Sequence, residues 1–434
     1  MAVVGAGLSG LAAARHLQDR GRHPVVFEAT GRVGGRQRSS ELGGTIVEEG
    51  AVFFGKQYPN LWRRIRAAGL EGELKTYHAM RMRTLEAQRA GTTCRPRSRV
   101  TTTQLAALRR VLPRREKVKL VQMTAEILPR GGELRAMLGN EVSSKWLRRL
   151  DAVPAAHWLE AKVGPRFTES FASPIMESLS FADASEWSAL GALMLMTFSA
   201  TPRLHAIVGG NDRIAAAIAE PLEVRTGTSI TAISPDPGGV GVEADDGSRS
   251  FTSRFNDVVV AVPGPVAASL LHGELAEVVS CIRYSSSVVP AIVTDSPLDV
   301  PAVSFYEADS SNHISGLAVE RPCADGPILC FANVRSPLRE ELIDADDDRA
   351  LDVLSDTVER ATGVRPIPKA SKVIRWRHSI PVGEPGMLQH QARIRGLVGG
   401  VPHLELAGDY LVSPSQEGAL VSGARAAAAL IERG

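Results

Sequence analysis

The feature that most constrains the fold is a glycine-rich turn near the N-terminus. The run Gly5-Ala6-Gly7-Leu8-Ser9-Gly10 follows an apolar segment and precedes LAAARHLQDRG, whose apolar residues recur with helical spacing. The segment HPVVFEA then predicts a second strand, which ends at Glu28. Strand, glycine turn, helix and strand begin a parallel α/β sheet, and such a turn lets backbone N–H groups and a helix N-terminus approach a pyrophosphate.

Glu28 makes this turn more specific. It lies 18 residues after Gly10, at the end of the second predicted strand, where a carboxylate can accept hydrogen bonds from both ribose hydroxyls of an adenosine. The turn alone is weak evidence, because glycines also occur in purely structural turns. Its placement between a strand and a helix, with an acid at this spacing, predicts a dinucleotide site, although NAD and FAD share this half-site.

Further motifs at both ends of the chain narrow the choice of dinucleotide. They are GRVGGR at 31–36, LAGDY at 406–410, EGA at 417–419 and SG at 422–423. With these residues the sequence resembles the flavin amine oxidase superfamily, which includes monoamine oxidases, protoporphyrinogen oxidases and phytoene-desaturase-type enzymes. The resemblance implies an α/β fold in which a Rossmann-like FAD-binding domain of the GR2 type is interleaved with an α+β substrate domain.

The resemblance also implies roles for particular residues. Arg36 would pair with the FAD pyrophosphate, the turn around Gly50 and Ala51 would pass near the flavin, and Asp409 would bind the pyrophosphate and ribitol region. The N-terminus of the last helix would stabilise negative charge on the reduced flavin. The whole predicted set is Gly5, Gly7, Leu8, Ser9, Gly10, Glu28, Ala29, Gly35, Arg36, Gly50, Ala51, Ile230, Gly408, Asp409, Gly418 and Ala419. We expect non-covalent FAD, since no cysteine follows Cys330.

The sequence departs from the amine oxidase pattern in two places. Amine oxidases of this group place an aromatic ring just before the final Gly-Ala, and here Ser415 or Gln416 stands there. The segment 284–296 contains no lysine where the family would place the one that holds a water at the flavin. The first departure argues against a cage of two aromatic rings around an amine. The second favours the protoporphyrinogen oxidase and desaturase branches, and the AGDY, EGA and SG motifs favour desaturases.

The sequence motifs give candidates for the catalytic residues and for the electron acceptor. Flavin itself carries hydride transfer, so a dedicated protein base is optional. Trp376, Arg377 and His378 are candidates for the flavin-facing wall, and the alternative is a strand with a core Trp and solvated Arg and His. A second GxGxxG after a strand is absent, which predicts reoxidation by oxygen, a quinone or another carrier instead of NADPH-fed hydroxylation.

The length of 434 residues predicts two interleaved domains. We assign residues 1–58, 203–283 and 385–434 to the FAD-binding domain, and residues 59–202 and 284–384 to the substrate domain. The least polar stretch, 187–202, is too short to span a membrane. No export signal precedes the first predicted strand, and Cys94, Cys281, Cys323 and Cys330 lack metal-ligand spacing. We therefore expect a cytoplasmic protein with no disulfide and no metal.

Charge is distributed unevenly along a chain whose formal net charge is only +2. The segment from Lys56 to Leu150 contains 22 Lys and Arg against 7 Asp and Glu. Such a run can be a solvated helical face, or it can dock something acidic: a membrane surface, a carboxylated substrate or an acidic carrier protein. Nucleic acid is disfavoured, because no nucleic-acid-binding motif occurs in it.

The sequence thus predicts an FAD-dependent oxidoreductase that removes a hydride from a C–C or C–N bond of a small molecule. The alternatives are an amine or amino-acid oxidase, a flavin isomerase with no net oxidation, and a non-catalytic binding protein of the same fold. The combination of Glu28, GGR and AGD argues against the last, because a flavin-free relative needs none of them.

Overall fold

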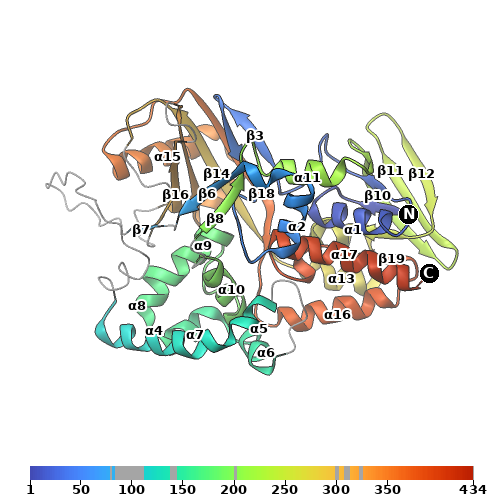
Figure 1. Cartoon of the computed structure of the whole chain (residues 1–434), viewed down its shortest axis with the longest axis horizontal. Coiled ribbons are helices and arrows are strands. Elements are labelled where there is room, and N and C mark those ends of the chain that lie inside the picture. Colours follow the sequence, from blue (N-terminus) through green and yellow to red (C-terminus); the bar gives the residue numbers. More distant parts are fainter. Residues whose placement is uncertain are drawn as a thin grey trace.

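The computed structural model describes residues 1–78, 81–83, 112–136, 144–199, 203–298, 303–306, 313–321 and 326–433. Its first part is built on a parallel sheet near the two termini, on the right in Figure 1. The sheet consists, in spatial order, of β19 (Leu404–Leu406), β13 (Val258–Val260), β1 (Ala2–Val4), β2 (Val25–Phe27) and β9 (Glu223–Arg225). All four pairings are parallel, so strands from both ends of the chain meet in one sheet.

Both faces of this sheet are covered, because successive strand residues point to opposite sides. Val3, Val26 and Val259 pack on one face against α1 (Leu8–Gln18), α2 (Pro59–Ala67), α11 (Asp212–Ala219) and α17 (Gln416–Arg433). The opposite face packs against α12 (Gly264–Leu270), α13 (Gly273–Ser280), α16 (Met387–Gly399) and an antiparallel sheet of β10 (Ser229–Asp236), β11 (Gly239–Asp245) and β12 (Ser250–Phe255).

A second sheet forms the upper left of Figure 1. Its spatial order is β18 (Ala370–Pro381), β14 (Tyr284–Thr294), β17 (Ile328–Val334), β16 (Ile314–Glu320), β15 (Val303–Tyr306) and β7 (Arg81–Arg83). Every pairing in it is antiparallel except β15 with β7. Helices α14 (Leu338–Leu342) and α15 (Asp347–Thr362) pack on one of its faces.

Two smaller sheets connect these parts. One is the hairpin of β3 (Ser39–Leu42) and β4 (Thr45–Glu48), and the other contains β5 (Phe54–Gly55), β8 (Arg203–Ile207) and β6 (Leu74–His78). A helical region lies below the second sheet in Figure 1. Its helices are α4 (Arg114–Ile127), α5 (Gly131–Ala136), α6 (Lys145–Asp151), α7 (Ala155–Lys162), α8 (Pro165–Phe167), α9 (Ser173–Ser180) and α10 (Ala189–Ser199).

The structure confirms the predicted fold class of a parallel α/β part combined with a part of antiparallel sheet and helices. The domain boundaries stay a prediction. Helix α2, which those boundaries place in the substrate domain, buries Leu61 and Ile65 in the core of the parallel sheet. No helix in the described ranges is long and apolar enough to cross a membrane. Cys281 and Cys330 are free thiols, while Cys94 and Cys323 lie outside the described residues.

Candidate functional site

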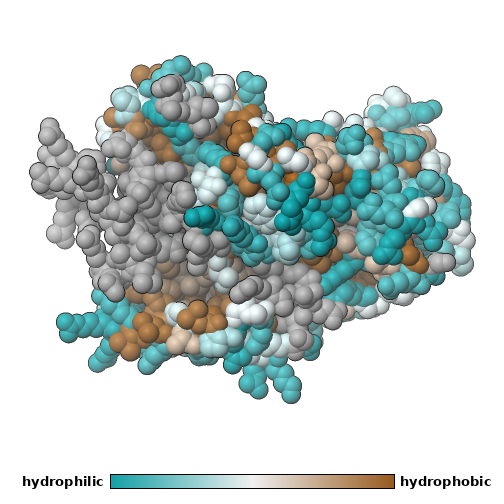
Figure 2. Space-filling view, in the orientation of Figure 1, coloured by the Kyte–Doolittle hydropathy of each residue, from teal (hydrophilic) through white to brown (hydrophobic). Residues whose placement is uncertain are grey.

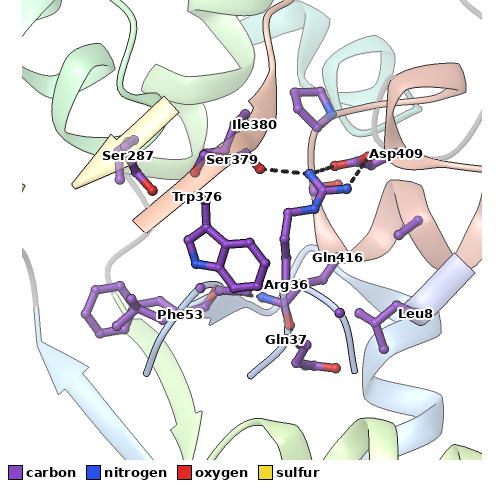
Figure 3. Close-up of a pocket in the computed structure, with 18 of the residues that line it drawn as sticks. Leu8, Arg36, Gln37, Phe53, Ser287, Trp376, Ser379, Ile380, Asp409 and Gln416 are labelled. Carbon is purple, nitrogen blue, oxygen red and sulfur yellow. Dashed lines mark hydrogen bonds and ion pairs between the residues drawn. The ribbon is translucent and has the colours of Figure 1, made fainter. Parts of the chain in front are cut away.

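One cavity of about 980 Å³ lies between the two parts of the molecule. Its lining begins at the glycine turn of α1, follows the loop after β2, passes β18 and the start of α17, and ends among helices of the lower region. Figure 3 shows its central section, where Arg36, Trp376 and Gln416 lie close together although they come from opposite ends of the chain. The centre of the site therefore forms only when segments far apart in the sequence fold together.

The glycine turn before α1 leaves space beside its backbone for a ligand. A Cβ at Gly7 would meet no atom within 4 Å and would project into the cavity that Gly7 lines. Gly35 has φ of +56°, and a Cβ there would come within 3.2 Å of the Gly7 Cα, so the two loops touch backbone to backbone. The first N–H groups of α1 have no intrahelical partner, and they open on this space. A pyrophosphate fits such a cradle.

Glu28 lies beside the turn and also lines the cavity. Its carboxylate accepts hydrogen bonds from the N–H groups of Ala6 and Thr30, each at 2.9 Å. The Thr30 hydroxyl also donates to the same oxygen, Oε1, at 2.8 Å. Each carboxylate oxygen has two acceptor positions, so Oε2 can still accept a hydroxyl donor from a ribose. The geometry therefore fits an adenosine at this end of the cavity.

Arg36 and Asp409 form a partly buried ion pair in the middle of the site. The Arg36 guanidinium donates to both Asp409 oxygens, at 2.8 and 2.7 Å, and to the Ser379 carbonyl at 2.9 Å. Burial disfavours the cation, but Asp409 and Tyr284 outweigh that effect and raise the pKa of Arg36. Figure 3 shows the guanidinium held between Ser379 and Asp409. Both predicted cofactor residues thus face each other at the cavity wall.

Two successive carboxylates at the end of β4, Glu48 and Glu49, differ in charge. Glu48 accepts hydrogen bonds from Ser39 Oγ at 2.6 Å and the Asn211 N–H at 3.0 Å, and its burial raises its pKa to about 8. Glu49 is buried as well, but it contacts Arg32, Arg38 and Lys372. Burial would raise the pKa of Glu49, yet Lys372 and the other donors lower it. Glu48 is therefore neutral near pH 7, and Glu49 is ionised.

The three catalytic candidates all line the cavity, in different settings. The Trp376 indole donates to the Glu49 carbonyl at 2.5 Å, and Figure 3 shows its ring facing Arg36. Arg377 is mostly exposed and pairs with Asp344. His378 packs edge-on against Tyr284, and burial together with Arg36 and Arg377 lowers its pKa. Their role in catalysis stays a prediction.

Of the predicted cofactor residues, most line the cavity. Those outside its lining are Gly10, Ala29, Ile230 and Gly418. Gly10 and Gly418 act through packing instead, since a Cβ on either would come within about 2 Å of a backbone oxygen, that of Gly5 or that of Ser413. Which of the sixteen residues contact the cofactor stays a prediction.

Sequence reasoning missed an amide chain at the centre of the site. Gln37 Nε2 donates to Gln416 Oε1 at 2.9 Å, and Gln416 Nε2 donates to the Phe53 carbonyl at 2.9 Å. The Phe53 carbonyl can only accept, and this fixes the orientation of both amides. Gln37 Oε1 is consequently a buried acceptor with no protein partner. The two glutamines are 379 residues apart, so no sequence spacing could have revealed them.

The fold and this cavity define a dinucleotide-binding protein with an attached substrate chamber. A family model described as flavin containing amine oxidoreductase matches residues 8–431, and the chain belongs to that family. It is an FAD-dependent oxidoreductase, which confirms the predicted class and cofactor.

The curated relatives match only a short part of the sequence, whereas solved structures match its whole length. Protoporphyrinogen oxidase 2 of Arabidopsis thaliana is 49% identical over 70 residues, which are 16% of this chain and 14% of that protein. A putrescine oxidase with redesigned cofactor binding has a TM-score of 0.76 at 19% identity, over 100% of this chain and 98% of that one. A fatty acid isomerase from P. acnes has a TM-score of 0.74 at 17% identity, over 100% and 97%. At these identities the solved structures show the shared fold alone.

Proposed function

We propose that the protein desaturates a C–C bond of an apolar small molecule, in the manner of a desaturase or a protoporphyrinogen-type oxidase. One carbon of the bond gives up a hydride from its C–H bond, and the neighbouring atom loses a proton to solvent. The observation that supports this most is that one cavity joins the dinucleotide cradle at Gly7 and Glu28 to an apolar chamber. When bound, FAD supplies the hydride acceptor. Oxygen or another acceptor then reoxidises it.

The chamber walls favour an apolar substrate. Helices and strands from three regions contribute large apolar side chains to it, and these include Phe53, Leu134, Leu179, Met194, Leu195, Phe198, Leu317 and Phe331. Such walls exclude water and orient a substrate mainly by shape. Trp376 closes the chamber on the β18 side, where its hydrogen bond to the Glu49 carbonyl fixes the ring.

Charge in the cavity argues against a cationic amine. The carboxylates among the described lining residues are otherwise engaged: Glu28 lies at the end of the cavity that fits an adenosine, Glu49 pairs with three cations, and Asp409 pairs with Arg36. Glu48 is neutral near pH 7 because burial raises its pKa to about 8. An ammonium group would find no free carboxylate within this described lining, so an amine or amino-acid oxidase is the second candidate.

Anaerobic flavin reduction tests the proposal. The pure protein should be yellow, with FAD that acid releases, and a neutral apolar donor such as phytoene should bleach it, whereas monoamines and amino acids should not. Bleaching by amines alone would make the second candidate correct. Conversion of an apolar substrate to an isomer without oxygen uptake would indicate an isomerase, and a colourless protein that cannot take up FAD would indicate a binding protein.

A pair of phenylalanine variants tests the chamber itself. Phe331→Ala should raise KM for the preferred donor and leave FAD content unchanged, because Phe331 lines the apolar chamber. Phe251→Ala is the matched control, since this half-buried ring lies on β12 and outside the cavity lining. Equal effects of the two changes on KM would remove Phe331 from the substrate site.

Two further predictions stay open. A carboxylated or carrier-bound substrate would suit the excess of positive charge between Lys56 and Leu150, although part of that segment lies outside the described residues. A cytoplasmic location is likewise a proposal, supported by the sequence alone.

A further inference from the structure

Helix α4 carries an exposed apolar stripe on the outside of the molecule. Val118 is 58% exposed, Val121 is 68% exposed, and Leu128, which continues the helix by one residue, is 71% exposed. At 100° per residue these three side chains fall within one third of the helix circumference. Figure 2 shows brown residues along the lower left edge, where Figure 1 places α4 and α7. Three large apolar side chains in water on one helix face indicate a surface that something covers.

Positive charge surrounds this α4 stripe. Arg114, Arg115 and Lys119 are exposed on the same helix, and Lys117 is half-buried. The acidic residues of α4 do not offset them. Glu116 is buried and accepts the N–H of Phe167 at 2.8 Å, while Glu126 pairs with Lys162 at 2.7 Å.

The α4 stripe is continuous with the cavity. Leu128 belongs both to the exposed stripe and to the cavity lining, and Ile127 and Leu134 line the cavity directly beside it. An apolar path thus leads from the outer face of α4 into the chamber. Among possible occupants of the stripe, a lipid surface fits best, because it offers both apolar depth and negative charge.

We propose that α4 lies on an anionic lipid bilayer, with Val118, Val121 and Leu128 inserted among the acyl chains and the flanking Arg and Lys residues at the headgroups. The bilayer contact itself does not depend on the flavin chemistry. Only the passage of an apolar substrate from the bilayer past Leu128 rests on the function proposed above. The association is peripheral, because the stripe covers one face of a helix of 14 residues.

Vesicle co-sedimentation of the full, FAD-loaded chain tests this. The protein should sediment with vesicles of phosphatidylcholine and phosphatidylserine, and much less with phosphatidylcholine alone. Binding should weaken as salt shortens the Debye length from about 10 Å at 0.1 M to about 3 Å at 1 M. The triple change V118S, V121S and L128S should lower the partition coefficient about tenfold or more. Reversing charge with R114E and R115E should lower it for the anionic vesicles by a similar factor.

Matched controls separate the stripe from general surface effects. V208S, V266S and I367S remove three other exposed apolar side chains, and R20E with R22E reverses two exposed cations away from α4. These variants should bind vesicles as the parent does, and they should keep the flavin absorbance, as should V118S combined with V121S. The proposal is wrong if the parent ignores both vesicles, or if the α4 changes weaken binding no more than the controls. It is also wrong if the α4 changes alter only the oligomeric state in light scattering, because the stripe would then join two copies of the chain.

Discussion

Arg36 lines the cavity, but its positive charge is paired with Asp409 and is not free for a pyrophosphate. The resemblance assigns it to the cofactor pyrophosphate, yet its charge is already matched by Asp409 at 2.7 and 2.8 Å. A pyrophosphate at this place would meet an ion pair with little net charge. The attraction must then come largely from the N–H groups at the start of α1, whose dipole favours an anion. Arg36 positions the loop as much as it supplies charge.

Glu28→Ala should weaken FAD binding. Its carboxylate faces the cavity and orders the glycine turn through Ala6, and each charge-assisted hydrogen bond contributes about 1.5 to 3 kcal/mol. We expect Kd for FAD to rise by roughly one to two decades. Titration of the flavin-free protein by flavin fluorescence measures it. Glu243→Ala, which removes an exposed glutamate from β11, should leave Kd unchanged. An equal Kd for both variants would remove Glu28 from the site.

Glu48 should make stability depend on pH. In the folded chain burial raises its pKa from 4.5 to about 8, so between these values the folded state holds a proton that the unfolded state has lost. The stability of the parent should therefore fall across this window, and Glu48→Gln, which keeps the contacts to Ser39 and Asn211 without a charge, should not share that loss. The Tm of Glu48→Gln relative to the parent should rise from pH 5 to pH 8.5. Glu41→Gln, an exposed site on β3, should show no such trend, and a flat difference for both would contradict the buried-proton account.

At the scale of elements, the crossing of α1 and α17 joins the first and last helices directly behind the glycine turn. Gly423 makes this contact possible, since a Cβ on it would lie 2.0 Å from the Ser9 carbonyl oxygen and 3.0 Å from the Ala12 Cβ. The obstacle is backbone, which cannot rotate away as a side chain can. The small residues of α17 therefore set the distance at which the helix behind the cofactor cradle can pack.

Gly423→Ala should separate these helices and destabilise the protein by about 1 to 3 kcal/mol or more. Differential scanning calorimetry measures the loss in Tm. Gly396→Ala is the matched control, because Gly396 lies inside α16 with no atom within 4 Å of its Cβ position, and alanine there favours the helix by up to about 1 kcal/mol. If Gly423→Ala is as stable as Gly396→Ala, the helices are free to move apart without cost.

The sequence predicts those parts of the site whose residues lie close together along the chain, and it does not predict contacts between distant residues. The turn from Gly5 to Gly10 and Glu28 were predictable, because strand, turn, helix and strand form within 30 residues and obey local rules. The contacts of Trp376 with Glu49 and of Gln37 with Gln416 join residues 327 and 379 apart. Spacing and periodicity carry no information about such pairs, so the wall of the cavity had to come from the tertiary structure.

At the scale of the whole molecule, the cavity is the place where the two parts meet. Its lining takes residues from the parallel-sheet part, from β14, β16, β17 and β18 of the second sheet, and from the helical region. A ligand that contacts several of these parts stabilises them together, because binding to the folded state alone adds a free energy of RT ln(1 + [L]/Kd). The cofactor should therefore act as a structural link as well as a reactant.

Removal of FAD should lower stability and loosen the cavity wall specifically. At a free FAD concentration of 100 Kd the bound form gains about 2.7 kcal/mol over the flavin-free form, so the Tm should rise with FAD concentration. Hydrogen exchange should speed up on FAD removal in the first turn of α1 and in the part of β18 around Trp376, which line the cavity. Helix α15 is the internal control, since it packs on the second sheet and contributes nothing to the lining. Uniform acceleration that includes α15 would instead indicate global unfolding, and the two parts would then form one cooperative unit with or without the cofactor.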